Sequence, residues 1–273
     1  MSTYTPLIPR EGWHVMHLFY QIDHSQWQCL SQEEQRSAKT RLTQLVQEIR
    51  STPDTHLLTF AIATPKADLG FMLLTPDLHV ANAFEKRLTL SLGADILNAS
   101  YSYLSQTEGS EYTTTSEQYI EETLIGEKGL SRGTPEFDTA LKEFEDRMAH
   151  YLKHRLNPVL PDWPAICFYP MSKRRSGQDN WYSLDYKARR ELMAGHARVG
   201  RTYSGRILQL ITGSTGLDEY EWGVTLLAKD TMDIKAIVYE MRFDEVSARY
   251  AEFGDFYIGM QLPLDELFRR VCL

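Results

Sequence analysis

Short apolar runs and longer amphipathic stretches alternate along the first half of the chain, and their order predicts an α+β protein. The short runs are rich in branched and aromatic residues, which is typical of buried strands. The longer stretches repeat apolar positions every three or four residues, as helices do. We expect strands at 13–22, 56–64, 69–75 and 99–106, and helices at 26–50 and 77–91. The first half therefore has the order β, α, β, β, α, β.

The second half has the same order of elements, although no repeat is visible residue by residue. We expect strands at 165–169, 206–212, 221–228 and 243–253, and helices at 184–199 and 230–241. Two successive βαββαβ units are the pattern of a duplicated ferredoxin-like fold, the dimeric α+β barrel type, in which each half makes an antiparallel sheet with two helices on one face. The two sheets can pack together or close into a single barrel.

A polar connection at 107–160 separates the two halves. Within it, 135–156 has apolar residues at helical spacing, which predicts a long helix rather than a structureless loop. We place an N-terminal ferredoxin-like domain at 1–110, a helical connection at 111–160 and a C-terminal ferredoxin-like domain at 161–273.

Charge, composition and the absence of known motifs argue against several classes of function. The 273 residues include 37 acidic and 29 basic side chains, and a net charge of −8 argues against general attraction to nucleic acid or anionic membranes. The three cysteines fit neither a zinc motif nor a disulfide framework, which favours a reducing cytoplasm. No stretch approaches the ~18 to 20 apolar residues of a membrane span, and the polar opening segment lacks a signal core. Nucleotide-binding and hydrolase motifs are absent from the sequence.

Two polar residues interrupt otherwise apolar faces in the second half. Leu184, Ala188 and Leu192 recur every four residues before His196, so the imidazole projects from an apolar helix stripe. Such a histidine can ligate a metal or heme iron, and the alternative is a core histidine held by a backbone carbonyl. Gln209 lies between two isoleucines on one strand face, and a buried amide needs either a protein partner or a ligand.

A third signal combines a phenol with positive charge. Tyr169 stands at a strand end, and the basic run 173–175 follows it. This combination could bind an anionic aromatic ligand, although a solvated charged turn is equally consistent with the residues. Arg155, Arg242 and Ser247 could add carboxylate contacts, because guanidinium groups and hydroxyls donate hydrogen bonds to carboxylates.

Four segments carry a resemblance to a known family. The segments CFYPMSKRR, NWYSL, ELMAGHARVGRTYSGRILQLITGSTGLDEYEWGVTL and YEMRFDEVSARYAEFG resemble the coproheme decarboxylases of the chlorite dismutase family. These blocks run from about 154 to 259, whereas the N-terminal half matches mainly in its order of elements. The resemblance implies two ferredoxin-like domains per subunit, assembled as a homopentamer.

The resemblance also implies a reaction. Fe-coproporphyrin III (coproheme) would have two of its four propionates oxidatively decarboxylated to vinyl groups by hydrogen peroxide, giving heme b. This is the last step of coproporphyrin-dependent heme biosynthesis, and the iron porphyrin is both substrate and redox centre. The implied partners are therefore the porphyrin and peroxide, with neither nucleic acid nor a membrane span.

The family pattern suggests roles for individual positions. His196 matches the axial iron ligand, and Tyr169 resembles a catalytic tyrosine that is oxidised to a radical and takes a hydrogen atom from a propionate. Lys173 matches a lysine that holds a propionate and assists the second decarboxylation by proton transfer. The remaining positions expected to contact the porphyrin are Arg155, Pro170, Met171, Ser172, Gln209, Arg242 and Ser247.

Two residues separate this hypothesis from its competitors, which are another heme oxidoreductase of the superfamily (a chlorite dismutase or a dye-type peroxidase) and a non-catalytic heme carrier. Gln209 stands where chlorite dismutases carry an arginine, and a neutral amide cannot supply the permanent cation that retains hypochlorite. A carrier has no need of the oxidisable phenol of Tyr169. The dismutases also place a glutamate behind the iron-binding histidine, for which Glu219 and Glu221 are the candidates here.

Overall fold

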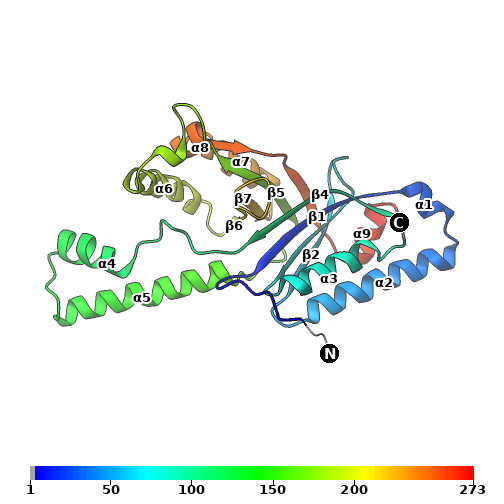
Figure 1. Cartoon of the computed structure of the whole chain (residues 1–273), viewed down its shortest axis with the longest axis horizontal. Coiled ribbons are helices and arrows are strands. Elements are labelled where there is room, and N and C mark those ends of the chain that lie inside the picture. The colour runs from blue at the N-terminus through cyan, green and yellow to red at the C-terminus, as the bar shows by residue number, and fades with distance from the viewer. Residues whose placement is uncertain (1–3) are drawn as a thin grey trace.

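The first repeat unit of the computed structural model, which describes residues 4–273, is a four-stranded antiparallel sheet (Figure 1). Its strands are β1 (His14–Ile22), β2 (His56–Ile62), β3 (Leu69–Thr75) and β4 (Leu97–Gln106). They lie in the order β4-β1-β3-β2. Its helices are α1 (His24–Cys29), α2 (Gln32–Ser51) and α3 (Leu78–Thr89). This order of strands is that of a ferredoxin-like unit, as the sequence predicts.

The second unit repeats this arrangement. Its strands are β5 (Ala165–Lys173), β6 (Ile207–Gly213), β7 (Trp222–Ala228), β8 (Ala251–Phe253) and β9 (Tyr257–Gln261). The order β6-β7-β5-β9 mirrors that of the first unit, and the short β8 pairs with the end of β5. Its helices are η2 (Trp181–Ser183, a 3₁₀ turn), α6 (Tyr186–Arg201), α7 (Thr231–Met241), α8 (Glu245–Tyr250) and α9 (Leu264–Arg270).

The two units share one closed sheet. β2 pairs with β9 through Phe60–Ile62, and β4 meets β6 at the pair Gln106 and Gly213. Because β5 pairs with β7 as well as β9, eight of the nine strands in the described chain form a ring. The duplicated ferredoxin-like fold is confirmed, and of its two possible arrangements the chain adopts the single barrel.

Strand alternation sorts the side chains of β5 between two apolar clusters. Phe168 points into the barrel, where it packs with Phe19, Leu227 and residues of the other strands. Tyr169 points outward, into a cluster that α7 covers. The strand therefore links the rigid interior of the barrel to the outer layer formed by α6, α7 and α8.

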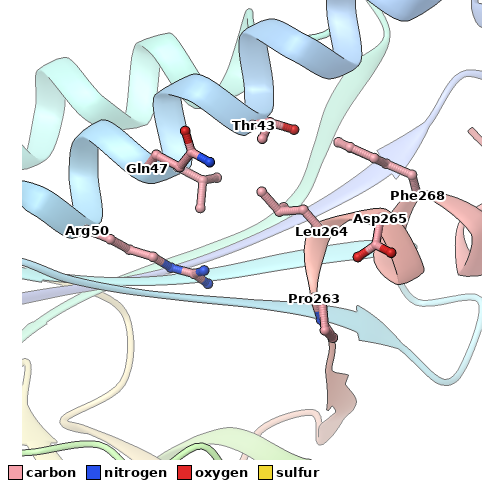
Figure 2. A pocket seen from close by; sticks show the side chains of 8 residues that line it. Thr43, Gln47, Arg50, Pro263, Leu264, Asp265 and Phe268 are labelled. Carbon is pink, nitrogen blue, oxygen red and sulfur yellow. The ribbon is translucent and has the colours of Figure 1, made fainter.

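The core of the first unit lies between its sheet and the helices α2, α3 and α9. The helix α2 begins with a capping box, in which Ser31 accepts from the backbone N–H of Glu34 and the Glu34 carboxylate accepts in return. Its fully buried Leu42 and Ile49 pack on the outer face of the sheet. At the far end, Arg50 donates to the carbonyl of Leu57 at 3.1 Å, beside a groove between α2 and α9 (Figure 2). Helix and strand are thus joined by a polar contact as well as by apolar packing.

The connection between the units is mostly helical. The helix α5 (Pro135–Leu156) has the bounds that the sequence predicts, and Thr134 caps it. A short α4 (Ser116–Gln118) and a π-helix η1 (Tyr119–Glu127) precede it and were not expected. Tyr119 stacks on Phe144 with ring centroids 4.0 Å apart, which fixes η1 to α5. Together these helices form an arm that extends from the barrel (Figure 1).

The predicted strand at 243–253 is wrong over most of its length. The segment Glu245–Tyr250 is helix α8, capped by Asp244, and only Ala251–Phe253 is extended. Val246 and Tyr250 are both buried at a spacing of four residues, a pattern that fits a helix better than a strand. The sequence prediction also missed β9 and α9, and it joined α1 and α2 into one helix. Between residues 4 and 273, no helix is both apolar enough and long enough to span a membrane.

Candidate functional site

The candidate site lies on the outer face of the second unit's sheet. Tyr169 and Lys173 are four residues apart on β5, so both side chains project from the same face. Gln209 of β6 belongs to this face as well, because β7 pairs with both strands and keeps them in register. Tyr169 belongs to the same apolar cluster as Val224 and as Ile234 of α7, which confirms its outward direction.

Tyr169 has an apolar environment. The residue is 8% exposed, and its ring stacks on Phe256 with centroids 4.3 Å apart. Burial raises the pKa of the phenol, while the nearby Arg242 opposes the rise. In the described residues, no side chain forms a hydrogen bond with the hydroxyl. A protonated phenol without a protein partner is free to react with, or bind, a ligand.

Lys173 is a buried cation. It is 7% exposed, and its Nζ lies 4.9 Å from the centroid of the Trp181 ring. Burial lowers its pKa to about 8, and the negative charges of Asp244 and Glu221 limit the decrease. No carboxylate of residues 4–273 forms an ion pair with it. Because a buried charge is costly without a partner, an anionic ligand would be bound here favourably.

The basic run 173–175 therefore does not form one cluster. Arg174 forms long ion pairs with Asp179 at 3.7 Å and with Glu252 at 3.8 Å. Arg175 is exposed to solvent. Only Lys173 faces the interior of the site.

His196 lies on α6, a helix that Asp185 caps by accepting from the backbone N–H of Ala188 at 2.8 Å. The side chain of His196 is 24% exposed, and its Nδ1 lies 2.7 Å from a carboxylate oxygen of Asp244. The structure thus shows a carboxylate partner instead of the backbone carbonyl expected for a core histidine. With Nδ1 engaged, Nε2 is the nitrogen available to a metal.

Neither glutamate considered from the sequence stands behind this histidine. Glu219 is exposed, and Glu221 contacts Lys173 and Tyr182 instead. Sequence reasoning missed Asp244 because it assigned this segment to a strand. The signal that could have found it is an aspartate, a preferred N-cap residue, directly before a segment whose apolar residues Val246 and Tyr250 are four apart.

The packing of α6 is loose for a helix with an apolar stripe. None of its sixteen residues is buried. It packs mainly against α7 and α8, and it approaches the sheet at its last turn, where the Gln209 amide donates to the Gly200 carbonyl at 3.3 Å. Gln209 is thus half-buried, and the protein itself supplies one partner for its amide. The half-exposed stripe around His196 is a surface that a flat apolar ligand could cover.

Of the other residues predicted to contact the porphyrin, three lie on the outer face of the second unit. Arg242 directly follows α7, and its guanidinium carbon lies 4.5 Å from the centroid of the Phe253 ring. It is close enough to affect the pKa of Tyr169. Met171 is half-buried on the same face, and Ser247 is buried in the first turn of α8. Arg242 and Met171 thus lie near Tyr169, whereas the backbone N–H of Ser247 donates at 3.4 Å to the same Asp244 oxygen that contacts His196.

Three predicted residues point elsewhere. Pro170 and Ser172 alternate with Tyr169 along β5, and the Ser172 hydroxyl accepts from the backbone N–H of Glu221 at 3.2 Å. Arg155 lies at the end of α5 and donates to the carbonyl of Glu108 at 2.7 Å. Its side chain is therefore not gathered with Tyr169 and Lys173 in this structure.

Comparisons with known proteins agree with this fold. The family model described as chlorite dismutase matches residues 35–262. Over 261 residues the chain is 41% identical to a coproheme decarboxylase of Thermus thermophilus, covering 94% of this chain and 93% of that protein.

Solved structures give the same result. A heme-binding protein from Thermus thermophilus superposes with a TM-score of 0.79 at 38% identity, covering 99% of this chain and 100% of that one. A mutant of the chlorite dismutase from Candidatus Nitrospira defluvii has a TM-score of 0.72 at 17% identity over 97% of both chains, which shows a shared fold alone. The matched model, the sequence identity and the duplicated barrel together establish that the chain belongs to the chlorite dismutase family.

Proposed function

We propose that this protein is a hydrogen peroxide-dependent coproheme decarboxylase that converts Fe-coproporphyrin III to heme b. The observation that carries the proposal is the placement of Tyr169 and Lys173 on one face of β5, in the layer that also contains His196. The overall reaction balances for each propionate: with one hydrogen peroxide and one proton it gives a vinyl group, carbon dioxide and two waters. The identity with a coproheme decarboxylase over nearly the whole chain supports the same assignment.

The donor set of the site fits an iron porphyrin with carboxylate arms. His196 presents Nε2 from an apolar stripe while the Asp244 carboxylate accepts from Nδ1, an arrangement that orients the imidazole and makes it a stronger donor to a metal. Lys173 and Arg242 provide two cations for propionates. When bound, the iron supplies the redox chemistry with peroxide.

The protein's own groups then have distinct tasks. Lys173 binds and orients a propionate through its ammonium, and it can deliver a proton from Nζ because its pKa is about 8. Tyr169, once oxidised, takes a hydrogen atom from the β carbon of the propionate. The apolar neighbours of Tyr169 exclude water from its hydroxyl. Gln209 is neutral, so it can orient a small ligand without adding charge.

The test is to add hydrogen peroxide to the protein loaded with coproheme and to measure the mass of the extracted porphyrin. We expect a three-propionate intermediate and then heme b, each step losing carbon dioxide and two hydrogens. Tyr169→Phe should bind coproheme and leave its mass unchanged. If the wild-type protein binds coproheme and its mass never falls, a heme carrier becomes the better assignment.

We also propose that the protein acts in the cytoplasm as a homopentamer, as the family resemblance implies. Native mass spectrometry of the purified protein counts the subunits directly. A monomer at micromolar concentration would contradict the proposed assembly without affecting the proposed reaction.

A further inference from the structure

Glu221 is a buried carboxylate that the proposed reaction does not use. It is 6% exposed and lies directly before β7. One of its oxygens accepts from the backbone N–H of Lys173 at 2.7 Å, and the other accepts from the Tyr182 hydroxyl at 2.6 Å. Its own backbone N–H donates to the carbonyl of Met171 at 3.1 Å. A single side chain thus connects the end of β5 to the η2 turn.

These contacts converge on the environment of Lys173. Tyr182 is the neighbour of Trp181, and the Trp181 ring lies beside the Lys173 ammonium. The backbone N–H of Trp181 donates to the carbonyl of Arg174 at 2.9 Å, which closes the loop between them. Glu221 therefore fixes the backbone of the lysine with one oxygen and the turn that carries its aromatic neighbour with the other.

The charge of Glu221 has a further consequence. Burial of a carboxylate without an ion pair costs free energy, and an apolar residue in its place would avoid that cost. Lys173 is the nearby positive charge, and its buried ammonium is stabilised by the negative charge of Asp244 and, to a smaller extent, by that of Glu221. Asp244 is already engaged by His196, and Arg174 is turned outward to Asp179 and Glu252. Glu221 is thus the carboxylate whose contacts are all directed at the lysine and its turn.

We propose that Glu221 is a positioning residue for Lys173: it holds the Lys173–Trp181 pair in place and keeps the ammonium charged toward the propionate that it binds. This inference rests on the proposed function for its consequence in turnover, but the effect on Lys173 itself can be measured without coproheme.

The substitution Glu221→Gln separates charge from geometry. The amide oxygen can accept from Lys173, and the amide nitrogen can donate to the phenol oxygen of Tyr182, so both hydrogen bonds survive. Acetic anhydride labelling of the ligand-free protein across a pH series, read by peptide mass spectrometry, reports the neutral fraction of Lys173. Loss of the negative charge should move the labelling midpoint to lower pH and increase labelling at pH 7 by about threefold. The control Glu219→Gln removes an exposed carboxylate two residues away and should leave the profile unchanged.

Turnover provides the second measurement. With coproheme and peroxide, Glu221→Gln should accumulate the three-propionate intermediate at alkaline pH, and a lower pH should restore the second decarboxylation. Glu221→Ala loses the hydrogen bonds as well, so acid should not rescue it. The thermal transition of each variant checks that it folds.

A labelling profile of Glu221→Gln that superposes on the wild type would overturn the proposal. So would a decarboxylation defect that is the same at every pH, because it would show a purely structural effect. Failure of the wild-type protein to convert coproheme would instead refute the proposed function, and the labelling experiment would still decide the role of Glu221.

Discussion

The contact between His196 and Asp244 leads to a quantitative prediction about iron binding. Substitution of Asp244 by Asn removes the negative charge behind the imidazole but keeps a side chain that caps α8 nearly as well. The 2.7 Å bond to Nδ1 then changes from charge-assisted to neutral. Charge-assisted hydrogen bonds contribute about 1.5 to 3 kcal/mol and neutral ones about 0.5 to 1.5 kcal/mol, so about 1 to 2 kcal/mol is lost.

Because the imidazole becomes a stronger Nδ1–H donor when its Nε2 binds a metal, most of this loss should appear in metal binding and only a smaller part in folding. A free energy of about 1 to 2 kcal/mol corresponds to roughly a 5- to 30-fold change in an equilibrium constant, within the range of about 10- to 100-fold typical of groups that orient metal ligands. Absorption titration with iron coproporphyrin measures the affinity, and urea unfolding of the ligand-free protein should differ from wild type by less than ~1 kcal/mol.

The metal-free porphyrin is the matched control for this experiment. Coproporphyrin III without iron keeps the four carboxylates but offers no bond to His196, so Asp244→Asn should bind it as tightly as the wild type. If the substitution weakened both porphyrins equally, the carboxylate would act on the shape of the site and not on the metal bond. If it weakened neither, His196 would not be the iron ligand.

Three further predictions address the other groups of the site. Tyr169→Phe should abolish decarboxylation and leave coproheme affinity within about twofold, because the ring keeps its apolar contacts and loses only an unpaired hydroxyl; the porphyrin mass and the absorption titration measure the two effects. Lys173→Met should increase the stability of the ligand-free protein at pH 7. Burial lowers the pKa of Lys173 to about 8 from 10.5, so between these pH values the unfolded chain binds more protons than the folded one, and the free energy of unfolding of the wild type rises with pH. Urea titrations across this pH range should show that the rise is lost in Lys173→Met and kept in the exposed control Lys187→Met. Finally, backbone amides of α6 should exchange hydrogen faster than those of α2 in the ligand-free protein and become protected when coproheme binds, whereas α2 should not change.

Local sequence patterns predicted most of the fold, but they could not predict that the barrel closes. The spacing of apolar residues predicted seven strands and the main helices, because each of these elements buries one face and its apolar residues lie on that face. Whether the two sheets pack or join depends on pairs far apart in the sequence, such as Gln106 with Gly213. A single such pair leaves no pattern along the chain.

The sequence likewise predicted some side chains of the site and not others. His196 and Gln209 were identifiable because each interrupts an apolar face, and Tyr169 and Lys173 because a phenol at a strand end is followed by a basic run. Asp244 was not, because the sequence can mark it as a helix cap but cannot mark it as the partner of His196. Its role comes from a contact across 48 residues, which only the fold brings about.

The unequal burial of the two units explains why the candidate site lies in the second one. The first unit has a dense core between its sheet and the helices α2, α3 and α9, and the barrel interior continues this packing through Phe168. Directly beside Phe168, Tyr169 points to a layer whose helix α6 buries none of its own residues. A lysine without an ion pair and a phenol without a hydrogen bond are tolerated there because the barrel supplies the stability that they do not. The same strand therefore anchors the site and leaves its reactive groups unsatisfied, which is the condition that a tightly held anionic ligand requires.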